Sequence, residues 1–301
     1  MPNQLSQDAF IDAAKFISDN GTDLHRARYR FHFENQPAQE VTRALATYQN
    51  DDGGFGHGLE GDLRTKNSSV LCSTVALQIL KEIDADPHSV MIADTMNYLV
   101  QQYRHKNWSL INSECNDAPH APWWKHDGKT QCRRSFYANP GAEILSNLLS
   151  FPGDMCRQTV SNLTVRALAH LETESLDMHD LLCYTRLYES VDPDLQGQML
   201  PHLLRWAFEL VKVDAFDWEE YCLTPLDVVK RPDSIFSDFF GAYLEQNFAF
   251  MMDQQRTDGS WQTTWSWGGE YPATWQVVEP EISAEVTLRF LLRLKAFNML
   301  S

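Results

Sequence analysis

The sequence has no long apolar run, and this excludes one class of protein at once. No stretch approaches the roughly 18 to 20 consecutive apolar residues that a membrane-spanning helix needs. Residues 1–4 are not followed by the apolar segment of an export signal. We therefore expect a protein of the cytoplasm with no stable membrane insertion.

Positive charge and paired cysteines are also scarce. The 301 residues include 25 Lys and Arg against 41 Asp and Glu, a formal net charge of −16. This charge repels phosphate backbones, so nucleic acid is not an expected partner. No two cysteines have C-x-x-C spacing, which favours reduced thiols over a disulfide framework. The six cysteines are Cys72, Cys115, Cys132, Cys156, Cys183 and Cys222.

The alternation of apolar and polar residues that is typical of β-strands is almost absent, whereas helical periodicity of apolar residues recurs along the whole chain. The 43% hydrophobic content is enough for a large core, and we expect one all-α domain over residues 1–301. The pattern predicts eleven helices, close to six pairs, joined mostly by short linkers. They span 8–20, 24–33, 37–49, 68–83, 87–103, 139–151, 155–173, 178–189, 193–213, 234–255 and 282–297.

One turn sequence occurs twice in the same context. Gln255-Arg256-Thr257-Asp258-Gly259-Ser260-Trp261 has a degenerate counterpart in Gln49-Asn50-Asp51-Asp52-Gly53-Gly54-Phe55. Each copy follows one apolar helix and precedes another, so each reads as the turn of a repeating helical unit. A structural role explains most of these residues: Gly can take the positive φ that ends a helix, Asp can accept main-chain N–H groups, and Gln can cap carbonyls.

These turns carry a resemblance to known families. Gln-x-x-Asp-Gly-Ser-Trp is the QW motif of triterpene cyclases, and Asp52-Gly53-Gly54-Phe55-Gly56 resembles the form found in protein prenyltransferase β-subunits. With Asn139-Pro140-Gly141, Trp218-Glu219-Glu220-Tyr221 and Trp265-Ser266-Trp267, the sequence resembles bacterial single-domain members of this superfamily, most of which have no assigned activity. The resemblance implies an (α/α) toroid of about six helix pairs around a central cavity.

The catalytic motifs of that superfamily are not recognisable here. Class II terpene cyclases protonate an alkene with an Asp-x-Asp-Asp acid, and the nearest substitutes are Asp192-Pro193-Asp194 and Asp217-Trp218-Glu219-Glu220. Both suit a solvated, acidic helix start equally well. Prenyltransferases hold zinc with Asp, Cys and His, and only His179, Asp180 and Cys183 bring these types together. We expect neither a metal nor a cofactor.

Polar residues that directly follow the first turn are the main candidates for a pocket. His57, Glu60, Asp62 and Arg64 lead into the helix predicted at 68–83, and in toroids of this kind the segment after the turn reaches the mouth of the cavity. Glu143 follows Asn139-Pro140-Gly141 near the start of another helix. Acids at helix starts are also common without any functional role. We assign Asp62, Glu60 and Glu143 as candidate acids, and His57 and Arg64 as candidate binding residues.

Most of the nine tryptophans lie in two long irregular segments, 107–137 and 261–280. Loops this long and aromatic usually cover something. His120, Trp123 and Trp124 in the first segment, and Trp265 and Trp267 in the second, are candidate binding residues. Aromatic walls can stabilise a cation or a carbocation, but they can equally close one end of the fold as core.

The sequence thus predicts a protein that binds a small, largely apolar molecule, with an isoprenoid as the example, and transforms it by acid–base chemistry. Two alternatives stay open. One is a binding or scaffolding protein with the same fold and no chemistry. The other is a carbohydrate-active α/α barrel, which would combine aromatic platforms with paired carboxylates. The sequence does not predict an oligomeric state.

Overall fold

The computed structural model describes residues 4–128 and 136–301, and in this part of the chain the protein is all-α. These described residues form twelve α-helices and three short 3-10 helices, and among them extended chain occurs only as isolated bridges. The predicted all-α fold class is confirmed. Residues 129–135, which include Cys132 and fall within the predicted segment 107–137, lie outside the described residues.

The chain divides into two compact units. The first comprises Met1–Ala44 with Glu209–Ser301, and the second comprises Leu45–Phe208. The prediction of a single domain over residues 1–301 stays a prediction, as does its toroidal arrangement.

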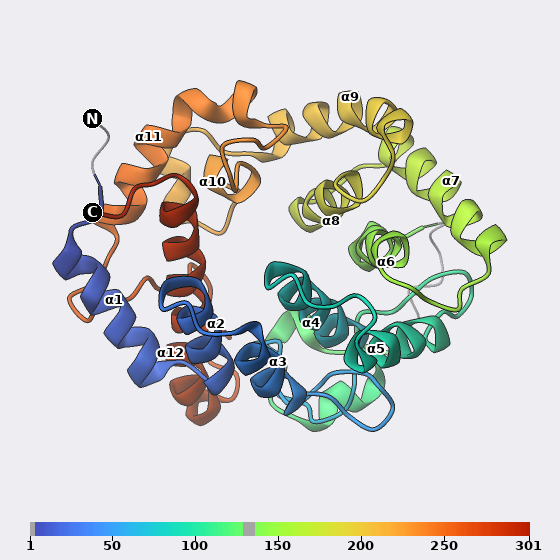
Figure 1. Ribbon diagram of the computed structural model, residues 1–301, viewed down its shortest axis with the longest axis horizontal. Helices are drawn as coiled ribbons and strands as arrows, with labels where there is room; N and C mark the ends of the chain where they lie inside the picture. The colour runs from blue at the N-terminus through green and yellow to red at the C-terminus, as the bar shows by residue number, and fades with distance from the viewer. Residues whose placement is uncertain (1–3, 129–135) are drawn as a thin grey trace. The chain divides into compact units, whose positions relative to one another are not determined.

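The first unit is built around its last helix, α12 (Pro272–Ala296), which packs against α1 (Gln7–Asn20) and α2 (Asp23–Phe33) (Figure 1). A further helix, α11 (Ser237–Asp253), packs against the short helices α10 (Pro225–Val228) and η3 (Ala215–Glu219). The buried core therefore joins residues from both ends of the chain. Its members include Ala13, Ile17, Phe248, Trp261, Leu288 and Leu291.

The second unit has α6 (Ala138–Ser150) in its core, packed against α4 (Val70–Glu82), α7 (Arg157–Thr173) and α8 (Met178–Tyr188) (Figure 1). A fifth helix, α5 (Val90–Gln101), packs on α4. Two short helices, η1 (Ser113–Asp117) and η2 (Pro122–Trp124), lie in the aromatic segment. The remaining helices, α3 (Ala38–Ala46) and α9 (Pro193–Leu210), each have residues in both units.

The predicted and observed helix boundaries differ most at α12, which begins at Pro272 and not near residue 282. Pro280 lies inside this helix, although proline removes a main-chain donor and usually ends a helical pattern. The prediction of irregular chain throughout 261–280 is therefore wrong for its second half. The four-residue helix α10 and the three 3-10 helices are too short to produce a periodic signal.

The two turns have the same hydrogen-bond pattern, as a structural role requires. Gln49 Nε2 donates to Gly53 O at 3.1 Å, and Gln255 Nε2 donates to Gly259 O at 3.1 Å. Asp52 Oδ1 accepts the main-chain N–H of Gly54, as Asp258 Oδ1 accepts that of Ser260. Both turn glycines have positive φ, +84° at Gly53 and +87° at Gly259. These turns hold each pair of helices together, and no reacting group is needed to explain them.

No helix in the described part of the chain combines the length and the apolar character that crossing a membrane requires.

Candidate functional site

The segment after the first turn pairs with the aromatic segment in the second unit. Arg64 N–H donates to Pro119 O at 3.0 Å, and Ala121 N–H donates to Asp62 O at 2.8 Å. These bonds form an antiparallel bridge between Leu63 and His120. The structure therefore places the predicted residues of 60–64 beside those of 120–124, two groups that are far apart in the sequence.

The side chains of this paired region differ widely in their exposure. Asp62 is 6% exposed and His120 is 3% exposed, whereas Trp123 is 48% exposed. Glu60, Arg64 and Trp124 are half-buried. The buried indole N–H of Trp124 has no hydrogen-bond partner among the described residues. Asp62 and His120 are thus the two titratable side chains of this region that are shielded from water.

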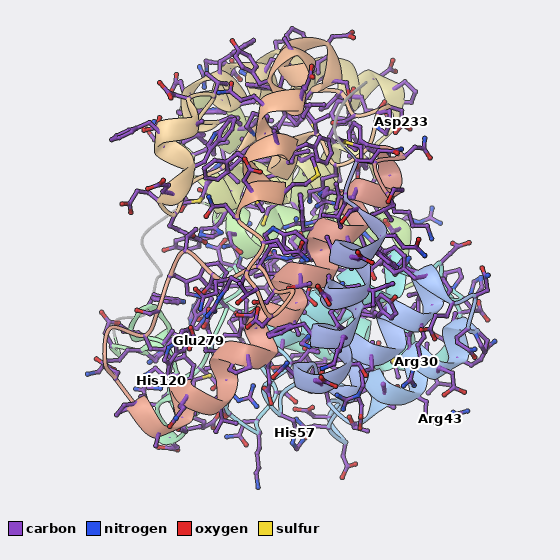
Figure 2. All side chains as sticks on the ribbon, turned by 90° about the vertical axis from the view of Figure 1, so that its left-hand side faces the viewer. Arg30, Arg43, His57, His120, Asp233 and Glu279 are labelled. Carbon is purple, nitrogen blue, oxygen red and sulfur yellow. The ribbon has the colours of Figure 1, made fainter. Side chains whose placement is uncertain are left out.

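The two predicted binding histidines have different surroundings. The ring of His120 has Nδ1 2.7 Å from the carbonyl oxygen of Ala118. Since a carbonyl can only accept, Nδ1 carries the proton, and Nε2 is the acceptor position of the neutral ring. His57 is exposed (Figure 2). Its Nε2 lies 2.8 Å from Asn50 Oδ1 in the first turn. This contact favours a turn-stabilising role for His57.

Glu143 lies elsewhere in the second unit, at the contact between α6 and α8. Its carboxylate forms an ion pair with the guanidinium of Arg186, and Glu143 is 2% exposed. Burial by itself lowers the pKa of Arg186, but Glu143 and Cys183 together raise it above its ordinary value. A permanent positive charge beside Glu143 suits a fixed ion pair better than an acid that delivers a proton.

One turn further along α6, Asn147 is completely buried, and neither atom of its side-chain amide has a hydrogen-bond partner among the described residues. The buried Oε1 atom of Glu143 also has no hydrogen-bond partner among the described residues. Buried polar groups in this state are usually satisfied by ordered water. Together with Ser146, which accepts a hydrogen bond from Lys81 at 3.1 Å, they form a polar cluster inside the helical core.

Trp265 and Trp267 belong to the first unit. Trp267 is 1% exposed and lies 5.5 Å from Trp275 between ring centroids. Trp265 is half-buried and makes an edge contact with Tyr221 at 5.6 Å. Both indoles are thus packed on other aromatic rings of their own unit, which fits the core alternative. Whether they join Asp62 and Glu143 in one cavity stays a prediction.

The remaining candidate acids and candidate metal ligands lie in surroundings that fit a structural role. Glu219 and Glu220 are exposed, and Asp180 accepts the main-chain N–H of Asn139 at 3.1 Å. Burial raises the pKa of the Cys183 thiol to about 12, so this thiol does not ionise readily to a metal-binding thiolate. Among the described residues, no three His, Cys, Asp or Glu side chains gather closely enough to hold a metal ion.

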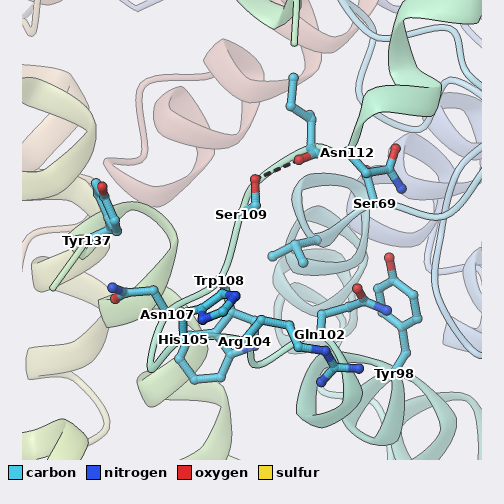
Figure 3. A pocket seen from close by; sticks show the side chains of 12 residues that line it. Ser69, Tyr98, Gln102, Arg104, His105, Asn107, Trp108, Ser109, Asn112 and Tyr137 are labelled. Carbon is cyan, nitrogen blue, oxygen red and sulfur yellow. Dashed lines mark hydrogen bonds between the residues drawn. The ribbon is translucent and has the colours of Figure 1, made fainter. Parts of the chain in front are cut away.

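The second unit contains a pocket that the sequence did not indicate (Figure 3). Its volume is about 150 Å³, and it lies between the start of α4, the end of α5 and the chain from Arg104 to Asn112. None of the described lining residues is a predicted site residue. They are Ser69, Val70, Tyr98, Gln102, Arg104, His105, Asn107, Trp108, Ser109, Ile111, Asn112 and Tyr137.

The buried wall of this pocket is apolar and aromatic. Val70 and Tyr98 are each 4% exposed, and Trp108 is 3% exposed. Trp108 Nε1 donates to Leu99 O at 2.7 Å, which fixes the loop to α5, and Leu71 N–H donates to Leu110 O at 2.9 Å, which fixes it to α4. Burial raises the pKa of Tyr98, so its phenol keeps its proton. The wall is therefore rigid, with a hydroxyl as its polar group.

The first turn also shapes this pocket. A Cβ at Gly54 would come within 2.8 Å of the Tyr98 ring and 2.6 Å of Ser68 Cβ, so only glycine leaves space for the ring in this position. A main-chain group of Glu60 hydrogen-bonds the thiol of Cys72 in the first turn of α4. The first turn and the residues after it thus contact both the pocket and the start of α4. They help to position the pocket and the paired region.

The geometry explains why the pocket residues were missed. The tryptophan-rich composition of 107–137 pointed to the loop, and Trp108 is its first tryptophan. Its partners Tyr98 and Val70 lie on helices, where an aromatic or aliphatic side chain reads as ordinary core. Only the tertiary contacts between α4, α5 and the loop leave a space between these side chains.

The arrangement can enclose an apolar group of modest size against aromatic rings, with amides and hydroxyls nearby to orient it. The paired region offers a shielded carboxylate and imidazole, the types needed for acid–base chemistry. No protein-family model and no curated protein matches the chain. The resemblance to the toroid superfamily therefore depends on the motifs of the sequence.

Proposed function

We propose that this protein binds a small, largely apolar molecule in the pocket beside the start of α4. The observation that carries the proposal is the 150 Å³ pocket with a buried wall of Val70, Tyr98 and Trp108. An apolar cavity of about this volume holds a molecule such as benzene. The pocket therefore suits one aromatic ring or one isoprene unit, whether as a whole ligand or as part of a larger one.

The lining favours binding over carbohydrate chemistry. Glycoside hydrolysis requires two carboxyl groups that flank the scissile bond. None of the described lining residues is Asp or Glu. We therefore place the carbohydrate-active alternative behind the binding protein.

The equivalence of the two turns supports the (α/α) toroid as the fold that carries this pocket. In the second unit the turn joins α3 to α4 and bonds to Met91 on α5. In the first unit it joins α11 to α12 and bonds to Ala9 on α1. The N-terminal helix α1 thus takes the place in the last repeat that α5 has in the earlier one. Completion of the last repeat by the first helix is what a closed ring requires.

Binding can be tested at Trp108 with protein that carries 5-fluorotryptophan. The Trp108 resonance in the ¹⁹F spectrum is assigned with Trp108→Phe, and 3-methylbut-2-en-1-ol and benzyl alcohol are then titrated, with glycerol as the polar control. We expect both probes, and not glycerol, to shift this resonance in a saturable way. Ile111→Trp should fill the pocket and abolish the shift. The matched variant Val165→Trp, at a residue of α7 that is 64% exposed, should not. If neither probe shifts Trp108, the proposal is wrong.

Acid–base chemistry by Asp62 is the second proposed function, and its support is the burial of this carboxyl beside the chain of His120. Protonation of an alkene and loss of a proton from the resulting cation would exchange hydrogen with solvent. Incubation of 3-methylbut-2-en-1-ol with the protein in D₂O should therefore introduce deuterium at carbon. Asp62→Asn keeps the shape and removes the titrating proton, so the rate should fall about 10² to 10⁴-fold. An unchanged rate would remove Asp62 from the mechanism.

A further inference from the structure

Arg104 is the one permanently charged side chain among the described residues that line the pocket, and His105 lies next to it. Arg104 and His105 are exposed at its edge, and none of the described lining residues is acidic. Acids outnumber Lys and Arg by 41 to 25 in the whole sequence. A lining drawn at random from this composition would be acidic more often than basic, so a lining with Arg104 and no acid runs against the charge of the whole sequence.

The two basic residues lie in a tight turn with an unusual backbone. Arg104 and Asn107 exchange two main-chain hydrogen bonds of 2.9 Å, and His105 and Lys106 between them have φ of +51° and +64°. Two-residue turns of this kind ordinarily use Asn-Gly, because positive φ costs other residues free energy. Here both positions carry long cationic or titratable side chains in place of the residues that suit the turn best.

Besides Arg104 and Lys106 in the turn itself, a further cation on α7 supports this turn. Arg166 donates to the carbonyl oxygen of Lys106 at 2.7 Å and to the Tyr103 hydroxyl at 3.3 Å. The carboxylates of Asp52 and Glu114 act instead on the Tyr98 hydroxyl, and Asp52 is held in the first turn by Ser68 at 2.7 Å. The side of the pocket formed by Arg104 and His105 is therefore a positive edge next to an apolar wall.

We propose that the ligand of this pocket is a small organic carboxylate, with its apolar part against Tyr98 and Trp108 and its carboxylate at the edge formed by Arg104 and His105 (Figure 3). The planar guanidinium can bind both oxygens of a carboxylate at once. Gln102 and Asn107 also line the pocket, and their side-chain amides can donate N–H groups. This inference rests on the proposed function and adds the charge of the ligand.

The test compares three ligands that share one ring and differ in their polar group. Benzoate, the neutral benzamide and phenyl phosphate are titrated into the full-length protein and followed by calorimetry and by the Trp108 fluorine resonance. We expect benzoate to bind at least tenfold more tightly than benzamide. Arg104→Gln should reduce this preference to about twofold or less, chiefly by weakening the binding of benzoate. Since Arg104 is exposed, the variant should fold, which circular dichroism can check.

Arg157→Gln, at an exposed arginine of α7 that does not line the pocket, controls for the loss of one positive charge from the whole protein and should keep the tenfold preference. Equal affinities for benzoate and benzamide, or an unchanged preference in Arg104→Gln, would overturn the carboxylate inference and leave the pocket proposal standing. Tenfold tighter binding of phenyl phosphate than of benzoate would replace the carboxylate by a phosphate. If no ring compound binds, the proposed function itself fails.

Discussion

The side-chain amide of Gln255 donates a 2.8 Å hydrogen bond to the carbonyl oxygen of Ala9, which lies 246 residues earlier in the sequence. Gln49 makes the corresponding bond to Met91 O at 3.3 Å. Three residues beyond each acceptor, at Asp12 and Asp94, the main chain lies against the glycine of the turn. A glutamine and a glycine thus join the turn to a neighbouring helix in the same way in both units.

The close approach at these glycines gives a first prediction. A Cβ at Gly259 would lie 2.3 Å from the carbonyl oxygen of Asp12, whereas a Cβ at Gly269 would meet nothing within 4 Å, although the two residues have φ of +87° and +88°. Gly269→Ala should therefore show only the cost of positive φ, about 1 to 2 kcal/mol. Gly259→Ala should lose clearly more, because α1 must move away. Urea denaturation measures both. Equal losses would show that α1 does not approach the turn so closely.

A second prediction concerns the aromatic residue of the same turn. Trp261 is 1% exposed, packs edge-on against Phe290 at 4.7 Å, and donates its indole N–H to Met251 O. Trp261→Ala should lower the free energy of unfolding by about 3 to 5 kcal/mol, because the cavity that it leaves cannot collapse fully. Phe216→Ala, at an aromatic residue that is 87% exposed, should change it by less than about 0.5 kcal/mol. Unchanged stability with altered ligand binding would instead assign Trp261 to a site.

The helices and the repeated turns could be predicted from the sequence because their signals are local. Gln255, Asp258 and Gly259 specify their turn through their spacing and through the positive φ that glycine takes at little cost. The pocket could not be predicted in this way. Tyr98 is at an ordinary core position of α5, but its ring can take its place only because Gly54 lacks a side chain, and Trp108 is tied to Leu99. Such a relation among three segments leaves no periodic signal.

The predicted acids show the same limit at the level of single side chains. Glu60, Asp62 and Glu143 look alike in the sequence, as acids near the start of a helix. In the structure Asp62 is buried beside the chain of His120, and Glu143 is paired with Arg186 on another helix. The partner of an acid decides whether it can exchange a proton, and that partner is chosen by helix packing.

A third prediction follows from His25 in the first unit, whose pKa is lowered from 6.5 to about 4, chiefly by burial and against the attraction of Glu285. Arg28 and Arg26 lower this pKa further. Because the folded pKa lies below the unfolded one, the stability that neutral His25 contributes is complete above pH 6.5. It is lost as pH falls toward 4, when the unfolded chain takes up the proton first. The loss between pH 7 and pH 4 amounts to about 3 kcal/mol.

Carboxylates titrate over part of the same pH range. The free energy of unfolding of the protein is therefore compared with that of the His25→Asn variant, which keeps an acceptor for the N–H of Thr22. The difference in unfolding free energy between the two proteins should shrink by about 3 kcal/mol from pH 7 to pH 4. A difference that stays constant with pH would show that His25 titrates alike in the folded and unfolded chains.

The last prediction separates a structural Glu143 from a catalytic one. Glu143→Gln would leave the guanidinium of Arg186 without its carboxylate inside the contact between α6 and α8. Loss of one partner of a buried ion pair costs about 3 to 5 kcal/mol. Asp19→Asn, which breaks the exposed pair of Lys15 and Asp19 on α1, should leave the stability nearly unchanged, because water screens this pair. Chemical denaturation measures both variants.

A double variant sharpens this test, because Arg186→Met removes the charge that Glu143→Gln leaves unpaired. If the carboxylate serves the ion pair, the double variant should be more stable than Glu143→Gln alone, since no isolated charge is then buried. If Glu143 instead delivers a proton to a ligand, Glu143→Gln should keep its stability and lose activity toward the bound molecule. That result would make Glu143 a catalytic acid and would weaken the proposed role of Asp62.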